Sequence, residues 1–224
     1  MTDLFISGLR IDWDSVDPAS YLHGIPSVRR IDELDFGKNV TFFVGENGSG
    51  KSTLLEAIAA SWGFNPEGGT KNYHVSTFDD LSPLCGAMTL IKGIRRPKYG
   101  FFFRAETFFN VVTEGLKEYQ SADDYHAVSH GEGIFRLMRK FGADGLYLMD
   151  EPEAALSPSR QIEIADLIRE LSKSGAQFII ATHSPILASL SGAEVLSFEE
   201  GKILKIPYRD TDGYRIYRQF FNEN

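Results

Sequence analysis

One short stretch of the sequence could bind phosphate groups. Residues 45–52 read GENGSGKS and fit the pattern G-x-x-x-x-G-K-[ST]. The glycines allow a tight turn, and the backbone N–H groups together with the start of the following helix favour an anion. Lys51 can reach the β- and γ-phosphates of a nucleotide, and the Ser52 hydroxyl can bind Mg²⁺. The predicted phosphate cradle consists of Gly45, Glu46, Asn47, Gly48, Ser49, Gly50, Lys51, Ser52 and Thr53.

The segments on either side of this stretch are those that a phosphate-binding loop needs. Residues 40–45, VTFFVG, predict a short buried strand, and residues 51–62, KSTLLEAIAASW, predict a helix with an apolar face. A plain glycine-rich turn is the alternative, but it needs neither the strand nor the helix. We therefore expect the loop to join a strand to a helix and to bind phosphate at the helix N-terminus.

Two adjacent carboxylates follow a second predicted strand. Residues 145–150 read GLYLMD, which places Asp150 at the carboxyl end of a buried strand, where ligands bind in open α/β sheets. We predict that Asp150 binds Mg²⁺ and that Glu151 is the general base or the group that orients water. An acidic turn at the end of an ordinary strand is the alternative.

A histidine follows a third predicted strand, AQFIIAT at residues 176–182. At the carboxyl end of a buried strand, His183 can donate a hydrogen bond to phosphate or to charge that develops in a transition state. A residue that merely begins a helix is the alternative for this position. The other four histidines show no metal-ligand spacing with cysteines, so we expect no zinc site.

In the order and spacing of these motifs, the sequence resembles the ABC-type ATPases. The resemblance is carried by DEPEAALSP at residues 150–158 and IIATHSP at residues 179–185, which follow the phosphate-binding loop, and it spans at least residues 40–200. It is closest to the small stand-alone AAA/SMC-like ATPases, which are kin to chromosome-maintenance and DNA-repair ATPases. It implies ATP and Mg²⁺ as ligands, ATP hydrolysis as the activity, and contacts of His183 with the γ-phosphate.

The resemblance also implies a fold. This is the α/β fold of a P-loop NTPase of ABC-ATPase type, with a mixed sheet core, an antiparallel β N-terminal part and a small helical subdomain that carries a signature motif. From about residue 142 onward, strands alternate with helices, which independently predicts parallel pairing with crossover helices. We expect one domain over residues 1–224, with an inserted β and helical subdomain at about residues 71–142.

The signature motif of this family is usually close to L-S-G-G-Q and binds the γ-phosphate of the nucleotide held by the other subunit. Residues 128–132, VSHGE, are similar. Ser129 would be the hydroxyl donor, and Gly131 would allow close backbone approach at a helix N-terminus. His130 replaces the first glycine and Glu132 replaces the glutamine, so a helix cap completed by Glu132 is the alternative.

Other family positions also differ in this chain. A loop after a strand normally offers a glutamine to the metal-bound water, but YGFFFRAETFF at residues 99–109 has none. We prefer Glu106 over Arg104 as its substitute at the metal site. The aspartate usually found at the dimer interface is Ser157, which a helix cap explains well. Three side chains could stack on adenine: Tyr21, Arg29 and Arg30.

Two stretches combine cations with aromatic residues. Residues 92–104, KGIRRPKYGFFFR, could bind single-stranded nucleic acid, although a solvated hairpin beside a buried strand is the favoured interpretation. Residues 208–221, YRDTDGYRIYRQFF, could meet a partner, although a terminal element packed against the domain is favoured.

Composition limits the classes of protein that fit. With 42% hydrophobic residues, the chain can form a core, and its net charge of −8 argues against a chain-wide electrostatic grip on nucleic acid but not against a local basic patch. The single cysteine, Cys85, forms no internal disulfide and predicts a cytoplasmic location. No apolar run approaches the ~20 residues of a membrane span, and the N-terminus does not read as a signal peptide, so we expect no direct membrane insertion.

We predict an ATPase that dimerises head to tail around two ATP molecules. Ser129 and Gly131 of one chain would close on the nucleotide held by Lys51 of a second copy, and a separately encoded effector or DNA is a further candidate partner. Three alternatives share the phosphate cradle: an ATP-gated binding module with little turnover, the energising subunit of a membrane transporter, and a phosphotransferase such as a small-molecule kinase.

Overall fold

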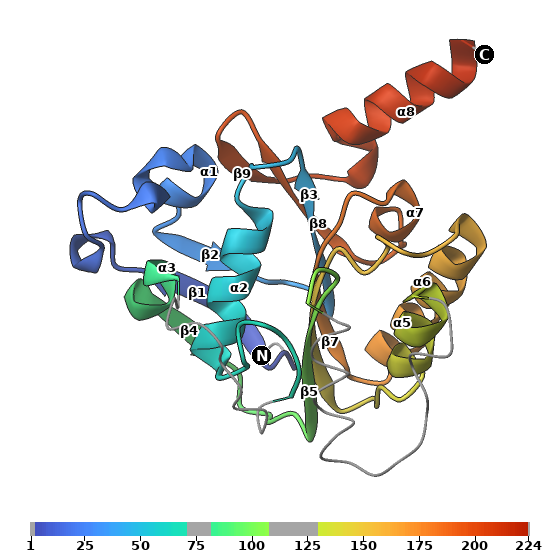
Figure 1. The fold of residues 1–224 in the computed structure, drawn as a ribbon, viewed down its shortest axis with the longest axis horizontal. Helices are drawn as coiled ribbons and strands as arrows, with labels where there is room; N and C mark the ends of the chain where they lie inside the picture. The colour runs from blue at the N-terminus through green and yellow to red at the C-terminus, as the bar shows by residue number, and fades with distance from the viewer. Residues whose placement is uncertain (1–2, 71–81, 108–129, 224) are drawn as a thin grey trace.

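The computed structural model describes residues 3–70, 82–107 and 130–223 (Figure 1). Two predictions lie at least partly outside these residues: Ser129, and much of the subdomain expected at about residues 71–142. Within the described part of the chain, no helix is both long enough and apolar enough to cross a membrane.

A six-stranded sheet forms the centre of the molecule. Its strands lie in the order β5 (Tyr99–Arg104), β6 (Gly145–Asp150), β7 (Gln177–Ala181), β3 (Val40–Gly45), β8 (Glu194–Glu199) and β9 (Lys202–Lys205). Neighbouring strands pair in parallel except at β9, which returns antiparallel to β8 through a tight turn. Because the five parallel strands run the same way, the predicted acids and histidine follow strands that end at one edge of the sheet.

A second sheet has three antiparallel strands in the order β2 (Glu33–Asp35), β1 (Ile6–Ile11) and β4 (Met88–Lys92). The buried amide of Gln177 on β7 joins the two sheets: its Oε1 accepts from the N–H groups of Phe5 and Ile6, and its Nε2 donates to the Ile6 carbonyl. The predicted mixed core with an antiparallel N-terminal part is confirmed.

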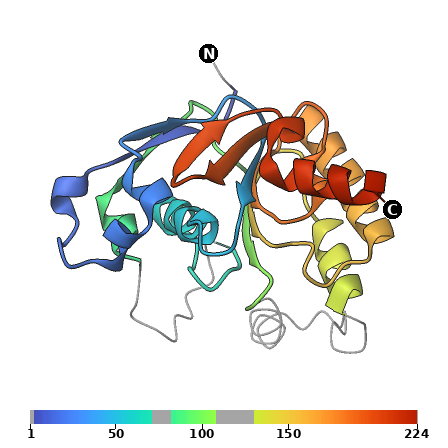
Figure 2. The same ribbon diagram turned by 90° about the horizontal axis from the view of Figure 1, so that it is seen from above.

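Helices cover both faces of the central sheet, so its inner strands β6, β7, β3 and β8 are buried on both sides. On one face, α2 (Lys51–Trp62) packs between the two sheets through Leu54, Leu55 and Ile58. On the other face lie α5 (His130–Met138), α6 (Pro158–Lys173) and α7 (Pro185–Ala188) (Figure 2). The remaining short helices are η1 (Trp13–Ser15), η2 (Tyr21–Gly24), α1 (Pro26–Arg29), α3 (Pro83–Ala87) and η3 (Tyr208–Asp210).

The basic stretch at residues 92–104 is not a hairpin, which corrects the favoured interpretation. Strand β4 pairs with β1 in one sheet, while β5 pairs with β6 in the other, so the stretch links two sheets. In this link Arg95 and Lys98 both bind Asp144, at 3.0 and 2.8 Å. The predicted subdomain at about residues 71–142 stays a prediction, because residues 71–81 and 108–129 are not described.

The last helix, α8 (Asp212–Glu223), projects from the body of the molecule (Figure 1). None of its residues is buried, and Ile216, Tyr217, Phe220 and Phe221 expose between 43% and 72% of their surface. The interpretation of residues 208–221 as a packed terminal element is therefore wrong for α8. It holds for the segment before α8, where Tyr208 packs against the core and Thr211 is buried.

Candidate active site

The loop between β3 and α2 has a backbone that requires glycine. Gly45 has φ +144° and Gly50 has φ +97°, a range that other residues rarely adopt. A Cβ at Gly45 would lie 2.6 Å from the Phe198 carbonyl oxygen, and a Cβ at Gly50 would lie 2.6 Å from Val28 Cγ2. The glycines of the motif therefore allow both the turn and its close packing against β8 and α1.

The N-terminus of α2 suits an anion. Its cap residue, Gly50, has no side chain that could accept from the first N–H groups of the helix. Ser27 of α1 donates its hydroxyl to the Ser49 carbonyl and so supports the loop from outside. Uncapped N–H groups at a helix start, beside a buried lysine, form the donor set that phosphate needs.

Lys51 is only 4% exposed. Its Nζ donates to the carbonyl oxygens of Gly45 and Glu46, at 2.9 and 2.8 Å, so the ammonium lies inside the curve of the loop. Burial lowers the pKa of Lys51, while the nearby charges of Glu151 and Asp150 act in the opposite direction. The loop thus holds a cation where phosphate charge would enter.

Ser52 and Asp150 meet, although 98 residues separate them in the chain. Ser52 Oγ donates to Asp150 Oδ1 at 2.9 Å. Burial raises the pKa of Asp150 to about 6, against the hydrogen bond from Ser52 and the charge of Arg104, which lower it. One hydroxyl and one carboxylate fit Mg²⁺, which takes few protein oxygens and fills its shell with water and phosphate. Accordingly, no cluster of three or more His, Cys, Asp or Glu that could hold a metal occurs in the described residues.

Glu151 and His183 lie together at the ends of neighbouring strands. Glu151 has φ +49°, and its N–H donates to the Ala181 carbonyl at 3.0 Å. Its Oε1 is 3.7 Å from His183 Nε2, and the two side chains are 45% and 38% exposed. A left-handed backbone at a residue other than glycine costs energy and occurs most often at functional sites.

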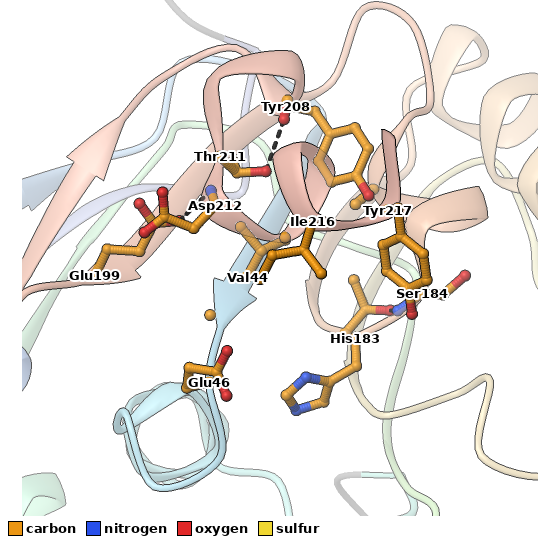
Figure 3. A pocket seen from close by; sticks show the side chains of 14 residues that line it. Val44, Glu46, His183, Ser184, Glu199, Tyr208, Thr211, Asp212, Ile216 and Tyr217 are labelled. Atoms are coloured by element: carbon orange, nitrogen blue, oxygen red, sulfur yellow. Dashed lines mark hydrogen bonds between the residues drawn. The ribbon is translucent and has the colours of Figure 1, made fainter. Parts of the chain in front are cut away.

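A pocket of about 300 Å³ is lined by His183, by Gly45 and Glu46 of the phosphate-binding loop, and by the start of α8 (Figure 3). Figure 3 shows Glu46 and His183 on one side of it and Ile216 and Tyr217 of α8 on the other. The start of α8 is held over the pocket because the Asp212 N–H donates to the Glu199 carboxylate at the end of β8, at 3.2 Å. The phosphate-binding loop, His183 and α8 therefore border one space.

The predicted substitute for the glutamine, Glu106, is 87% exposed and lies 3.9 Å from Arg104. Its charge raises the pKa of Asp150, so it lies within electrostatic range of that carboxyl. No hydrogen bond joins Glu106 to Asp150 among the described residues. Arg104 instead binds Glu56 of α2 at 3.0 Å and the Pro66 carbonyl at 3.1 Å, which braces β5 against α2.

In the signature-like motif, the structure describes the part that follows Ser129. Gly131 lies in α5, where a Cβ would be 2.5 Å from the Ala155 carbonyl oxygen. Glu132 binds Arg136 of the same helix and Arg160 of α6, each at 3.2 Å. These contacts fix the start of α5 against the loop that follows β6.

Other predicted positions have separate environments. Ser157 is confirmed as the cap of α6, since its Oγ accepts from the Arg160 N–H. Of the adenine candidates, Arg29 stacks over Trp13 at 4.7 Å and Arg30 donates to the Gly201 carbonyl, whereas Tyr21 is 59% exposed. The contact with adenine stays a prediction.

Sequence reasoning missed Glu153. Its Oε1 accepts from the backbone N–H groups of His183 and Ser184, at 2.6 and 3.1 Å. The signal available in the sequence was a further acid two positions after Glu151, but no spacing rule connects that acid with a loop 30 residues away.

Comparison with known proteins identifies the relatives of this chain. Residues 21–94 match the family described as "AAA domain", and residues 114–189 match "AAA domain, putative AbiEii toxin, Type IV TA system". The macrolide export ATP-binding/permease protein MacB of Mannheimia succiniciproducens is 25% identical over 197 residues, which cover 72% of this chain and 28% of MacB. An uncharacterized ABC transporter ATP-binding protein of Haemophilus influenzae is 25% identical over 190 residues, which cover 70% of this chain and 68% of that protein.

Among solved structures, the SMC head domain from Thermotoga maritima aligns with 91% of this chain and 99% of its own, with a TM-score of 0.48 and 17% identity. The chain spans less than a third of MacB and about two thirds of the Haemophilus influenzae relative.

Proposed function

Because the chain carries a P-loop ATPase domain of the AAA/ABC type, we propose that it binds ATP with Mg²⁺ at the loop after β3 and hydrolyses it in a head-to-tail dimer. The observation that carries this proposal is the hydrogen bond from Ser52 Oγ to Asp150 Oδ1. It joins the phosphate-binding loop to the acid at the end of β6, which is the pair of oxygens that a nucleotide-bound Mg²⁺ requires.

Each residue has a role that its position supports. Lys51 and the N–H groups of α2 bind the phosphates. Glu151 orients the attacking water and accepts its proton, and His183 donates a hydrogen bond to the γ-phosphate. Ser52 and Asp150 would hold Mg²⁺, which would supply positive charge to the phosphate oxygens. Positioning and charge stabilisation therefore supply most of the catalysis.

A second copy would complete the site. Glu151 and His183 are each more than a third exposed, so the groups that act on the γ-phosphate face outward from the chain. In a head-to-tail dimer, Ser129 and Gly131 of the second copy would approach that phosphate. The packing of Gly131 against the Ala155 carbonyl supports this arrangement, because it fixes the signature helix to the catalytic loop of its own chain.

The direct test is Glu151→Gln, which removes the proton acceptor but keeps the shape of the side chain. We expect ATP binding to be retained, turnover to fall by ~100-fold or more, and ATP to trap a dimer that light scattering detects. The matched control is Glu163→Gln on α6, an exposed glutamate bound to Arg160. Turnover of Glu151→Gln at the wild-type rate would exclude the assignment of the base.

A second experiment tests whether the chain has a partner. Purification of tagged Glu151→Gln with ATP should recover a partner held in the trapped state, either a separately encoded effector or DNA. Recovery of the chain alone would count against such a partner. A cytoplasmic location fits this role and stays a prediction from the single cysteine, Cys85, which is free.

Energising a membrane transporter is the second candidate, because the names of two relatives refer to export or transport. It predicts that tagged Glu151→Gln is recovered with an integral membrane protein after detergent extraction. If the partner is instead a soluble effector or DNA, tagged Glu151→Gln should be recovered with that partner in the absence of detergent.

A further inference from the structure

A carboxylate outside the proposed reacting groups holds the loop that carries His183. Glu153 Oε1 accepts two backbone hydrogen bonds, from the N–H of His183 at 2.6 Å and from the N–H of Ser184 at 3.1 Å. Hydrogen bonds to an ionised acceptor are shorter and stronger than neutral ones. The two bonds therefore tie the loop after β6 to the loop after β7.

A second set of contacts holds the same loop from the other side. Ser184 Oγ donates to Gln161 Oε1 at 2.6 Å, and Gln161 Nε2 donates to the Leu156 carbonyl at 3.0 Å. Ser184 also caps α7, since its Oγ accepts from the N–H groups of Ile186 and Leu187. With these contacts the backbone at residues 183–184 is anchored to residues 153–161 at two points.

Among the described residues, the carboxylate of Glu153 accepts hydrogen bonds through one oxygen only. Oε2 is buried and has no hydrogen-bond partner within the described residues. A buried polar atom without a partner is unfavourable, so the position of this carboxylate is explained by the two N–H groups that its other oxygen accepts. Glu153 cannot easily serve as the base, because its other oxygen already accepts two N–H groups.

From these contacts, we propose that Glu153 is a positioning residue that sets the place of His183 relative to Glu151. The proposal rests on the proposed hydrolysis of ATP, in which His183 contacts the γ-phosphate. Glu151 and Glu153 belong to one loop, and Glu153 fixes the backbone from which the His183 side chain extends. The 3.7 Å separation of Glu151 Oε1 and His183 Nε2 is the geometry that Glu153 maintains.

The same loop touches the signature helix. The Ala155 carbonyl oxygen, two residues after Glu153, lies 2.5 Å from the position that a Cβ at Gly131 would take. A second copy that closes on Gly131 would therefore press on the loop that holds His183. Through Glu153, nucleotide bound by the second copy would therefore affect the position of His183 in this chain.

The test is a double-mutant cycle between Glu153 and His183, with kcat and KM for ATP measured for each variant. Glu153→Ala should lower kcat by ~100-fold and change KM by less than about threefold. In a His183→Ala background, the same substitution should lower kcat by less than about twofold, because a residue that acts through His183 has nothing left to position. The matched control is Glu170→Ala, an exposed glutamate on α6.

If Glu153→Ala does not fold, a variant of nearly the same shape can be measured instead. Glu153→Gln keeps one oxygen that can accept both N–H groups but removes the charge, so its loss in kcat should be smaller, about 10-fold. The proposal would be overturned if either Glu153 variant lowered kcat by the same factor in the His183→Ala background as in the wild type. That result would show that Glu153 acts independently of His183.

An activity-independent measurement separates this proposal from the proposed function. The imidazole resonances of His183, assigned by their loss in His183→Ala, should shift in Glu153→Gln and stay in place in Glu170→Ala. Unchanged resonances would refute the positioning role. A shift in a protein that does not hydrolyse ATP would reject the proposed function and leave the positioning of His183 standing.

Discussion

The partly buried carboxyl of Asp150 makes the stability of the metal-free protein depend on pH in an unusual direction. Burial raises its pKa from 3.8 to about 6. A carboxyl with a higher pKa in the folded chain binds its proton more tightly there than in the unfolded chain. Its stabilising contribution is therefore complete below pH 3.8 and is lost as the pH rises through about 6.

The size of this effect follows from the two pKa values. A difference of about two pH units corresponds to about 3 kcal/mol of free energy of unfolding, at 1.36 kcal/mol per unit. The figure is an upper estimate, because Asp150 is partly exposed. The substitution Asp150→Asn removes the ionisation but keeps an oxygen that can accept from Ser52, so the variant should lack this pH dependence.

The assay is urea unfolding from pH 4 to pH 8 with a chelator present. The stability of Asp150→Asn minus that of the wild type should grow with pH and reach a plateau above pH 7, at up to about 3 kcal/mol. Glu170→Gln on α6 is the control for loss of an exposed carboxylate. A difference that stays flat between pH 4 and pH 7 would refute the reasoning. Adding Mg²⁺ and ATP should stabilise the wild type more than the variant, because only the wild type offers the cation the Asp150 carboxylate.

Three further predictions concern the loop and the sheets. Lys51→Ala should weaken ATP binding by about 10- to 100-fold, as expected for lost charged hydrogen bonds to phosphate, and calorimetry measures this; unchanged affinity would contradict the placement of Lys51. Gly50→Ala should destabilise the fold by about 1–3 kcal/mol because its Cβ would clash with the side chains around it. The control Gly48→Ala has open space around its Cβ and should cost about 1 kcal/mol from its backbone conformation alone. Equal losses of stability in urea unfolding would argue against the close packing at Gly50. Gln177→Leu should cost about 2–4 kcal/mol, since it leaves the N–H groups of Phe5 and Ile6 without their acceptor. A loss below about 0.5 kcal/mol would show that the amide does not join the sheets.

Much of the site and fold could be predicted from local sequence. The loop motif, the strand that ends at Asp150 and the strand before His183 each occupy a few consecutive residues, and an apolar run followed by a polar residue reads as a strand end. Parallel pairing then follows from the alternation of strands and helices, and it brings these strand ends to one edge.

Features that depend on distant partners could not be predicted in this way. The stretches that became β4 and β5 are adjacent in the chain and both read as strands, but strand pattern does not reveal which sheet each one joins. The aromatic residues of α8 show an apolar face without showing what covers it. Glu153 binds the backbone N–H of His183, and a backbone partner leaves no mark on the sequence.

The contacts within one chain divide the site into two parts. Lys51, Ser52 and Asp150 are held by hydrogen bonds that the chain makes alone, so the part that would bind phosphate and metal is preformed. Glu151 and His183 are partly exposed, and their relative position depends on Glu153. This division suits an enzyme that binds its nucleotide before the second copy arrives and hydrolyses it afterwards, since interactions completed only on closure raise the rate without tightening initial binding.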